Sequence, residues 1–114
     1  MDEAEVTVAA AVQALSERAL DVRRLFVAFE VSRIGREWTT AEVMSGFVVD
    51  VGDLTRLVMA AVGARHVDDL ESKLEHELSD CLWSVLVLAD RLGVNLGKAF
   101  DQTMGELTEF LGAQ

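Results

Sequence analysis

The sequence predicts an all-α fold built from four helices. None of its 114 residues is proline, and valine, leucine and alanine are the most frequent residue types. Such composition favours long helices, because strand and turn architectures normally carry proline and paired turn residues. Apolar residues also recur at intervals of three and four, which is the period of an amphipathic helix. With 51% hydrophobic residues the chain can build a core, so we expect a single domain over residues 1–114.

The first two helices are expected over residues 3–33 and 40–62. In the first, apolar residues recur in helical phase on one side. Gly35 then interrupts the pattern. Thr39 and Glu42 have the spacing of a capping box, in which the hydroxyl accepts a free N–H and the glutamate reaches back to the cap. The second helix should therefore begin at residue 40.

The last two helices also carry recognisable start signals. Asp68 and Glu71 give an acidic N-terminus of the kind that the helix dipole favours, so a third helix is expected over residues 68–92. Asn95 is the expected cap of a fourth helix that ends near residue 111.

The second and third helices are apolar on most of their sides. Between residues 47 and 62 only four side chains are polar, and Ser84 is the one polar residue in the run 81–89. The four are Asp50, Asp53, Thr55 and Arg56. Helices that are apolar all round are buried all round, and four helices in one chain of this size would leave some of these faces exposed to water. We therefore expect a homodimer or homotetramer that forms a larger helical bundle.

Charge and cysteine content exclude several classes of partner. The formal net charge of -10 argues against a nucleic-acid polymer, whose phosphates need a basic surface. The single cysteine, Cys81, cannot form an internal disulfide, which fits a reducing compartment. Residues 1–5 are acidic and lack a signal-type apolar core, and no apolar run approaches the roughly 20 residues of a membrane span. We expect a soluble, cytoplasmic protein with no membrane partner.

Two acidic pairs at helical spacing lie inside the apolar segments, Asp50 with Asp53 and Glu77 with Asp80. Residues three apart point to the same side of a helix, so the pairs can converge if the two helices pack antiparallel. An unpaired buried charge costs several kcal/mol, and the four carboxylates also repel one another, so a divalent cation is expected among them. Oxygen-only ligands select a hard ion, for which Mg²⁺ fits best and Mn²⁺ is a substitute.

The neighbouring side chains support an anionic ligand at these carboxylates. Lys73 lies on the same stripe of the third helix as Glu77 and Asp80, with His76 at its edge, and Arg56 flanks the first acidic pair. A di-iron site is the natural competitor, but its Glu-x-x-His signature is missing, since neither His66 nor His76 has a carboxylate three residues before it. Zinc is a weaker alternative, because there is one cysteine and the two histidines are ten residues apart.

These motifs resemble the MazG-like all-α nucleoside triphosphate pyrophosphohydrolases. The matching segments are WTT (38–40), GFVVDVGDL (46–54), ELSDCLW (77–83) and LADRLGVNL (88–96), which together cover about residues 38–100. The family pattern is Glu-x-x-Glu followed by Glu-x-x-Asp. Glu77 and Asp80 match its second half, whereas Asp50 and Asp53 replace both glutamates of the first half with side chains one methylene shorter.

The resemblance implies hydrolysis of a nucleoside triphosphate to a monophosphate and pyrophosphate, with a housecleaning role in the nucleotide pool. It implies that Asp50, Asp53, Glu77 and Asp80 are the catalytic metal ligands. Under the implied activity, Lys73 or Arg56 would contact the phosphates. Further substrate-binding candidates are Trp38, Trp83, His76 and Asn95. Each of these residues also has an explanation that involves no ligand. Trp38 can pack the interhelical loop on the core, Trp83 can pack in the core, His76 can be a surface residue, and Asn95 can cap a helix. Because of the two aspartates, the alternative function is a catalytically degenerate helical oligomer that binds nucleotides or other proteins.

Overall fold

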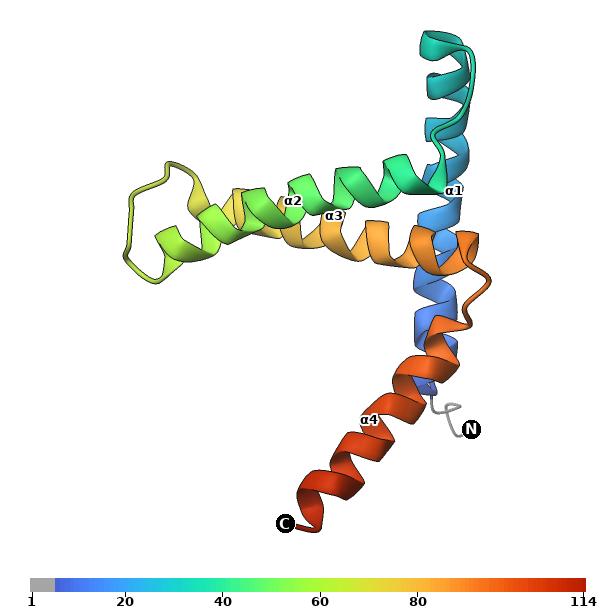
Figure 1. The fold of residues 1–114 in the computed structure, drawn as a ribbon. Helices are drawn as coiled ribbons and strands as arrows, with labels where there is room; N and C mark the ends of the chain where they lie inside the picture. The colour runs from blue at the N-terminus through green and yellow to red at the C-terminus, as the bar shows by residue number, and fades with distance from the viewer. Residues whose placement is uncertain (1–5) are drawn as a thin grey trace, which may run out of the picture.

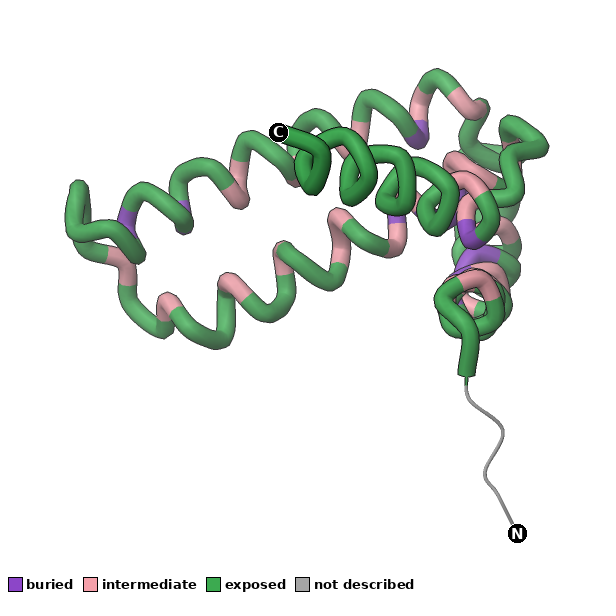
Figure 2. Tube along the Cα trace, turned by 90° about the horizontal axis from the view of Figure 1, so that it is seen from below, coloured by how far each residue is buried: buried purple, intermediate pink, exposed green. Residues whose placement is uncertain are grey.

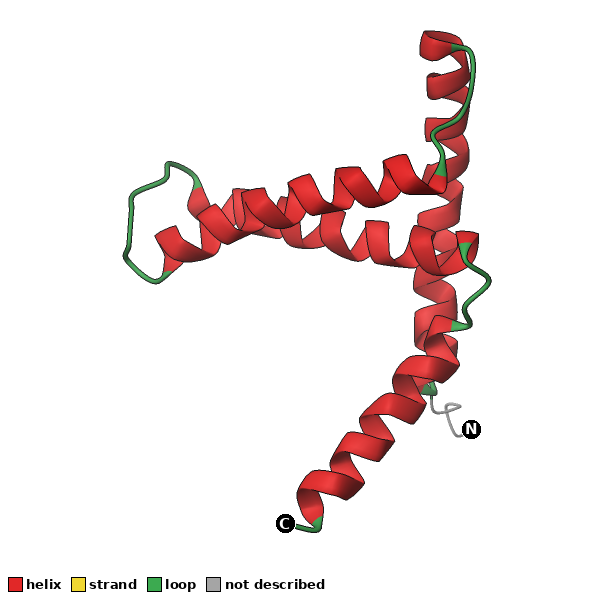
Figure 3. Cartoon of the chain, viewed as in Figure 1, coloured by secondary structure: helices red, strands yellow, loops and turns green. Residues whose placement is uncertain are grey.

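The computed structural model describes residues 6–114, which form four helices and no strand (Figures 1 and 3). The helices are α1 (Val8–Ile34), α2 (Thr40–Ala61), α3 (Leu70–Arg91) and α4 (Leu96–Gly112). The predicted all-α class is therefore confirmed. No helix in this described range is long and apolar enough to cross a membrane.

Local signals set the starts of α1 and α2. The Thr7 hydroxyl caps α1 by accepting the N–H of Ala10, so the predicted helix is wrong at residues 6 and 7, and its predicted start at residue 3 lies outside the described residues. The capping box of α2 is confirmed: Glu42 N–H donates to Thr39 Oγ1 over 3.1 Å, and Thr39 N–H donates to Glu42 Oε1 over 2.9 Å. A hydrogen bond from Arg36, together with those at the cap, lowers the pKa of Glu42 to about 2.

The start of α3 differs from the prediction, whereas that of α4 agrees with it. The predicted start at Asp68 is wrong by two residues, because the Asp68 carboxylate pairs with His66 Nε2 at 2.8 Å and Asp69 occupies the cap position. Asp69 has a left-handed backbone, with φ of 54°, and makes no side-chain cap bond. At α4 the Asn95 side chain accepts the N–H of Lys98 over 3.2 Å, so the predicted cap is confirmed.

The helices pack as an open T rather than as a closed bundle. α2 and α3 form a hairpin, which crosses α1 through α3, and α4 packs on α1 and then diverges from it (Figure 1). Most of the chain is exposed (Figure 2), and only six apolar residues among those described are buried. They are Ala19, Val43, Leu57, Ala60, Leu86 and Val87. The radius of gyration is 17.5 Å, against about 13 Å for a compact chain of this length.

One glycine permits the closest helix crossing. Gly97, in the first turn of α4, is buried against α1, and a Cβ built on it would lie 2.7 Å from the carbonyl oxygen of Ala9. No real side chain tolerates that distance to backbone. The crossing therefore depends on the hydrogen atom of glycine, and it fixes where α4 leaves α1.

A buried ion pair joins α1 to the start of α2. Arg23 donates two hydrogen bonds to Glu30, of 2.7 and 2.9 Å, and both side chains are more than 90% buried. Glu30 Oε1 also accepts the backbone N–H of Trp38 over 2.7 Å. From α3, Arg91 donates to the Trp38 carbonyl oxygen and to Thr40 Oγ1. The backbone N–H and the backbone carbonyl of Trp38 are thus both held by charged side chains.

This ion pair should control stability and its pH dependence. Burial alone would raise the pKa of Glu30, but the hydrogen bonds from Arg23 and Trp38 outweigh it and lower that pKa below 4.5. A lowered folded pKa adds stability above the usual value, and that stability is lost as the pH falls through the folded value. Glu30→Gln should destabilise the protein by about 3 kcal/mol at neutral pH, because it leaves the buried Arg23 charge with only a 4.0 Å contact to the carboxylate of Glu37.

Urea unfolding at fixed protein concentration measures this effect. The matched control is Glu17→Gln, which alters an exposed glutamate on the same helix. The control should unfold like the wild type. Equal unfolding of Glu30→Gln and the wild type would contradict a stabilising role for the ion pair.

Candidate functional site

The two predicted acidic pairs converge between α2 and α3. Carboxylate oxygens of Asp50 and Asp53 on α2 and of Glu77 on α3 lie within 4.8 Å of one another. Glu77 and Asp80 form a second group of the same size with a ring nitrogen of His76. The pairs meet because the hairpin brings the middle of α2 against the middle of α3. Glu77 belongs to both groups and so joins them into one carboxylate cluster.

The carboxylate cluster is poorly compensated by protein cations. Burial raises the pKa of Asp50, and the charges of Asp80 and Asp53 raise it further. Burial likewise raises the pKa of Glu77, followed by the charges of Asp50 and Asp80. Glu77 Oε2 is also buried without a hydrogen-bond partner. A buried acceptor of this kind costs roughly 1–3 kcal/mol unless a donor or a cation meets it.

A hard divalent cation fits this donor set. The carboxylate cluster offers oxygen ligands, which Mg²⁺ and Mn²⁺ prefer, and Glu77 Oε2 is an oxygen without any other partner. The thiol of Cys81, beside the cluster, has its pKa raised by burial and then by the neighbouring carboxylates, so it stays protonated and is a poor ligand at neutral pH. Asp50, Asp53, Glu77 and Asp80 would hold the ion, with His76 as an added nitrogen donor.

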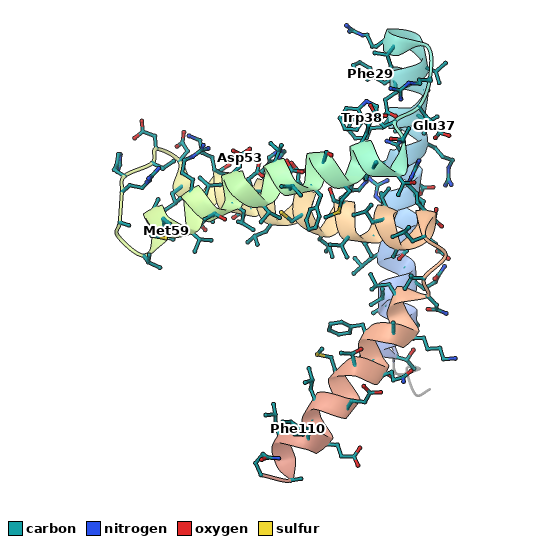
Figure 4. All side chains as sticks on the ribbon, in the orientation of Figure 1. Phe29, Glu37, Trp38, Asp53, Met59 and Phe110 are labelled. Atoms are coloured by element: carbon teal, nitrogen blue, oxygen red, sulfur yellow. The ribbon has the colours of Figure 1, made fainter. Side chains whose placement is uncertain are left out.

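A large aromatic hollow lies on one side of the carboxylate cluster. Its volume is about 910 Å³, and Asp50 and Asp80 are among its lining residues. Five aromatic side chains from three helices and one loop also line it: Phe26, Phe29, Trp38, Phe47 and Trp83. Phe29 and Trp38 lie in the corner between α1 and the hairpin (Figure 4). Apolar walls with carboxylates at one side suit a ligand that has a flat ring and either a cationic group or an anionic group that a metal ion would bridge to the carboxylates.

The two tryptophans of the hollow have structural contacts as well. The Trp83 indole N–H donates to the Ala19 carbonyl oxygen over 3.1 Å, and its ring packs on Phe26 at 5.4 Å between centroids. Trp83 therefore ties α3 to α1 while one part of it faces the hollow. Trp38 is 40% exposed, although its backbone is held firmly, and its ring lies over Gly46. Such an indole is fixed in place yet accessible.

A smaller, polar hollow lies on the other side of the carboxylate cluster. Its volume is about 350 Å³, and it combines the carboxylates of Asp53 and Glu77 with cationic or ionisable groups. Those groups are Arg56, Lys73 and His76. Arg56 pairs with Asp53 at 3.6 Å, and His76 Nε2 lies 3.0 Å from Asp80 Oδ2. The carboxylate cluster thus lies between the aromatic hollow and this smaller one. We refer to the smaller one as the cationic hollow, after Arg56 and Lys73, although Asp53 and Glu77 in its lining match their charges.

Of the predicted site residues, all except Asn95 lie around these two hollows. The Asn95 side-chain oxygen caps α4, and a role in substrate binding stays a prediction. Sequence reasoning missed the contribution of α1. Phe26 and Phe29 have the spacing of a core-facing stripe, so their pattern gave no sign that they would instead remain about half exposed.

Comparison of the chain with protein-family models, curated proteins and solved structures gives no match. Its function is therefore inferred from the geometry of its own residues.

Glu77 should be essential for binding Mg²⁺. Titration calorimetry should show Mg²⁺ binding to the wild type, and Glu77→Gln should weaken the affinity by at least about tenfold, since both ligand groups lose their shared carboxylate. Affinity should also fall as the pH is lowered, and it should begin to fall above the usual carboxylate range, because the raised pKa of Asp50 and Glu77 lets protons compete with the ion there.

Glu75→Gln is the matched control for this experiment, because Glu75 is exposed and lies two residues away on the same helix. It should bind Mg²⁺ like the wild type. A wild type that binds no Mg²⁺, or a Glu77→Gln variant with unchanged affinity, would contradict the metal site.

Without metal, the carboxylate cluster should reduce stability. A group whose folded pKa is raised loses stabilisation as the pH rises through that value, so Asp50 costs folding free energy at neutral pH. Asp50→Asn should therefore raise the melting temperature of the metal-free protein by a few degrees and remove stabilisation by added Mg²⁺. Asp101→Asn, on the exposed surface of α4, serves as the control in the same thermal scan. A lower melting temperature for Asp50→Asn would contradict the repulsion.

Proposed function

We propose that the protein is a Mg²⁺-dependent nucleoside triphosphate pyrophosphohydrolase, which forms a nucleoside monophosphate and pyrophosphate. The observation that carries the proposal is the position of the carboxylate cluster, with its unpartnered Glu77 oxygen, between the aromatic and the cationic hollow. A nucleotide has the same order of parts: a flat base, a phosphate chain that binds metal, and a terminal anion.

The aromatic hollow is assigned to the base and sugar. Its volume lies within the range of about 300–1000 Å³ that is typical of small-molecule sites. The exposed indole of Trp38 offers a stacking surface, and stacking of a base on an aromatic ring contributes about 1–3 kcal/mol. The phosphate chain then passes the carboxylate cluster, and its end reaches Arg56 and Lys73 in the cationic hollow.

Hydrolysis needs charge neutralisation and an oriented water. Bound Mg²⁺ supplies neutralisation of the phosphate oxygens and lowers the pKa of a coordinated water. Arg56 and Lys73 add positive charge at the leaving pyrophosphate. In the step itself, a water oxygen bonds to the α-phosphorus while the bond from that phosphorus to the α,β-bridging oxygen breaks. Asp50, which belongs to the carboxylate cluster and also lines the aromatic hollow, is assigned to accept the proton of the water.

The proposal includes assembly as a homodimer or homotetramer and a role in removing surplus or non-standard nucleotides. The short side chains of Asp50 and Asp53 leave more room beside the ions than glutamates would. Because of this difference, the second candidate function is a module that binds nucleotides or other proteins without turnover. The activity test below distinguishes the two functions.

Release of pyrophosphate from a panel of ribonucleoside and deoxyribonucleoside triphosphates, with Mg²⁺ or Mn²⁺, tests the activity. The wild type should release pyrophosphate from at least one nucleotide, and Glu77→Gln and Asp50→Asn should lose turnover while Glu75→Gln retains it. Thermal stabilisation by a non-hydrolysable triphosphate without any turnover would instead indicate the binding module. If the protein shows no turnover and also binds no Mg²⁺, both nucleotide functions are ruled out.

Trp38 should contribute to affinity more than to chemistry. Trp38→Ala should raise KM for the best nucleotide by about tenfold or more, as expected when a stacking contact of 1–3 kcal/mol is lost, with a much smaller change in kcat. Leu92→Ala, at an exposed position that lines neither hollow, is the control and should keep both constants. An unchanged KM for Trp38→Ala would show that the aromatic hollow does not hold the base.

A further inference from the structure

The α2–α3 hairpin has two faces of opposite character. Asp53 lies along the edge nearer to Phe29 and Trp38, whereas Met59 lies along the edge nearer to α4 (Figure 4). Residues that are two positions apart in a helix point to nearly opposite sides. The Val51 side chain therefore points away from that of Asp53, and the Leu78 side chain points away from that of Asp80. Val51 and Leu78 are 41% and 54% exposed. The hairpin thus carries its carboxylates on one face and bare apolar side chains on the other.

The apolar face of the hairpin is a continuous surface. On α2, Met44, Val48, Val51 and Val58 follow one another at intervals of four, three and seven, so they lie along one side of the helix. On α3, Leu78 and Leu82 form the corresponding row. All six side chains are exposed, and none of them is charged. We refer to these six residues as the hairpin wall.

The second apolar surface belongs to α4. Phe100, Met104, Leu107 and Leu111 repeat at intervals of four, three and four, and every residue from 101 to 114 is exposed. We refer to these four residues as the α4 wall. α4 packs on α1 near Gly97 and then projects away from it, so that the hairpin and α4 enclose an open angle below the hairpin (Figure 1).

The exposed area is too large for a monomer. The chain exposes 8439 Å², whereas a compact monomer of 12.5 kDa exposes about 6200 Å². The excess is roughly 2200 Å² per chain, or about 4400 Å² for two chains, which is within the range of 2000–5000 Å² buried by obligate homodimers. A core of six buried apolar residues is correspondingly small for 114 residues.

We propose that a second copy of this chain fills the open angle, with the hairpin wall of each copy packed against the α4 wall of the other. Each chain carries one hairpin wall and one α4 wall. A two-fold axis therefore buries all four walls of the two chains at once and closes the assembly. The uncharged walls fit each other, and the polar side of α4 remains in water. The carboxylates stay on the opposite face of each hairpin. This interface does not depend on any nucleotide chemistry.

Sedimentation equilibrium and thermal unfolding test the interface with the full chain. The wild type should have the mass of two chains or a multiple of two, and its melting temperature should rise with protein concentration, because folding is coupled to association. Leu107→Glu, in the α4 wall, and Val51→Glu, in the hairpin wall, should each dissociate or unfold the protein at concentrations where the wild type is assembled. Gln102→Glu adds the same charge to the polar side of α4 and should preserve the wild-type mass.

Several results would overturn the proposal. A wild type that sediments as a folded monomer with a concentration-independent melting temperature would exclude the second copy and leave the walls to a different partner. Loss of assembly in only one of the two wall variants would exclude reciprocal pairing of the walls. Since mass and folding are measured without nucleotide, a failed activity assay and a failed interface are separate outcomes.

Discussion

The architecture depends on the buried ion pair between Arg23 and Glu30. Both charges lie in α1, seven residues apart, and Glu30 also holds the backbone N–H of Trp38. Because Arg91 holds the carbonyl of the same residue, the connection into α2 is fixed from α1 and from α3. That double attachment sets the hairpin across α1. The aromatic hollow exists because this crossing leaves a corner between them.

Two groups of carboxylates in this protein show opposite responses to burial. Glu30 is buried with a guanidinium partner, and its pKa is lowered despite the cost of desolvation. Asp50 and Glu77 are partly buried beside other carboxylates, and burial first and then those charges raise their pKa. In the first arrangement the opposite charges are paired within the protein, although Arg23 Nε has no hydrogen-bond partner among the described residues, and the pair stabilises the fold. The second is incomplete and stores electrostatic free energy that a cation can release, so it is the better candidate for function.

The candidate site and the proposed dimer interface lie on different faces of the hairpin. The carboxylates and both hollows occupy one face of the hairpin, while the other face and α4 expose apolar side chains. A chain with few buried apolar residues gains little free energy from its own core, and in the proposed dimer apolar burial against the second chain would supply what is missing. The proposed ligand and the proposed second chain would then occupy opposite faces of the hairpin.

The sequence alone determined the helices, their main caps and the pairing of the carboxylates, because these depend on residues three or four positions apart. The capping box of Thr39 and Glu42 and the cap at Asn95 follow from spacing, and so does the convergence of Asp50 with Glu77 once the hairpin is assumed. The predicted start of α3 at Asp68 is wrong, because the Asp68 carboxylate pairs with His66 and Asp69 occupies the cap position. Only the tertiary structure decided the roles of α1 and Arg91. Glu30 accepts the backbone N–H of Trp38, and Arg91 donates to the carbonyl of the same residue from 53 positions away. These contacts depend on how the helices cross, which no local pattern specifies.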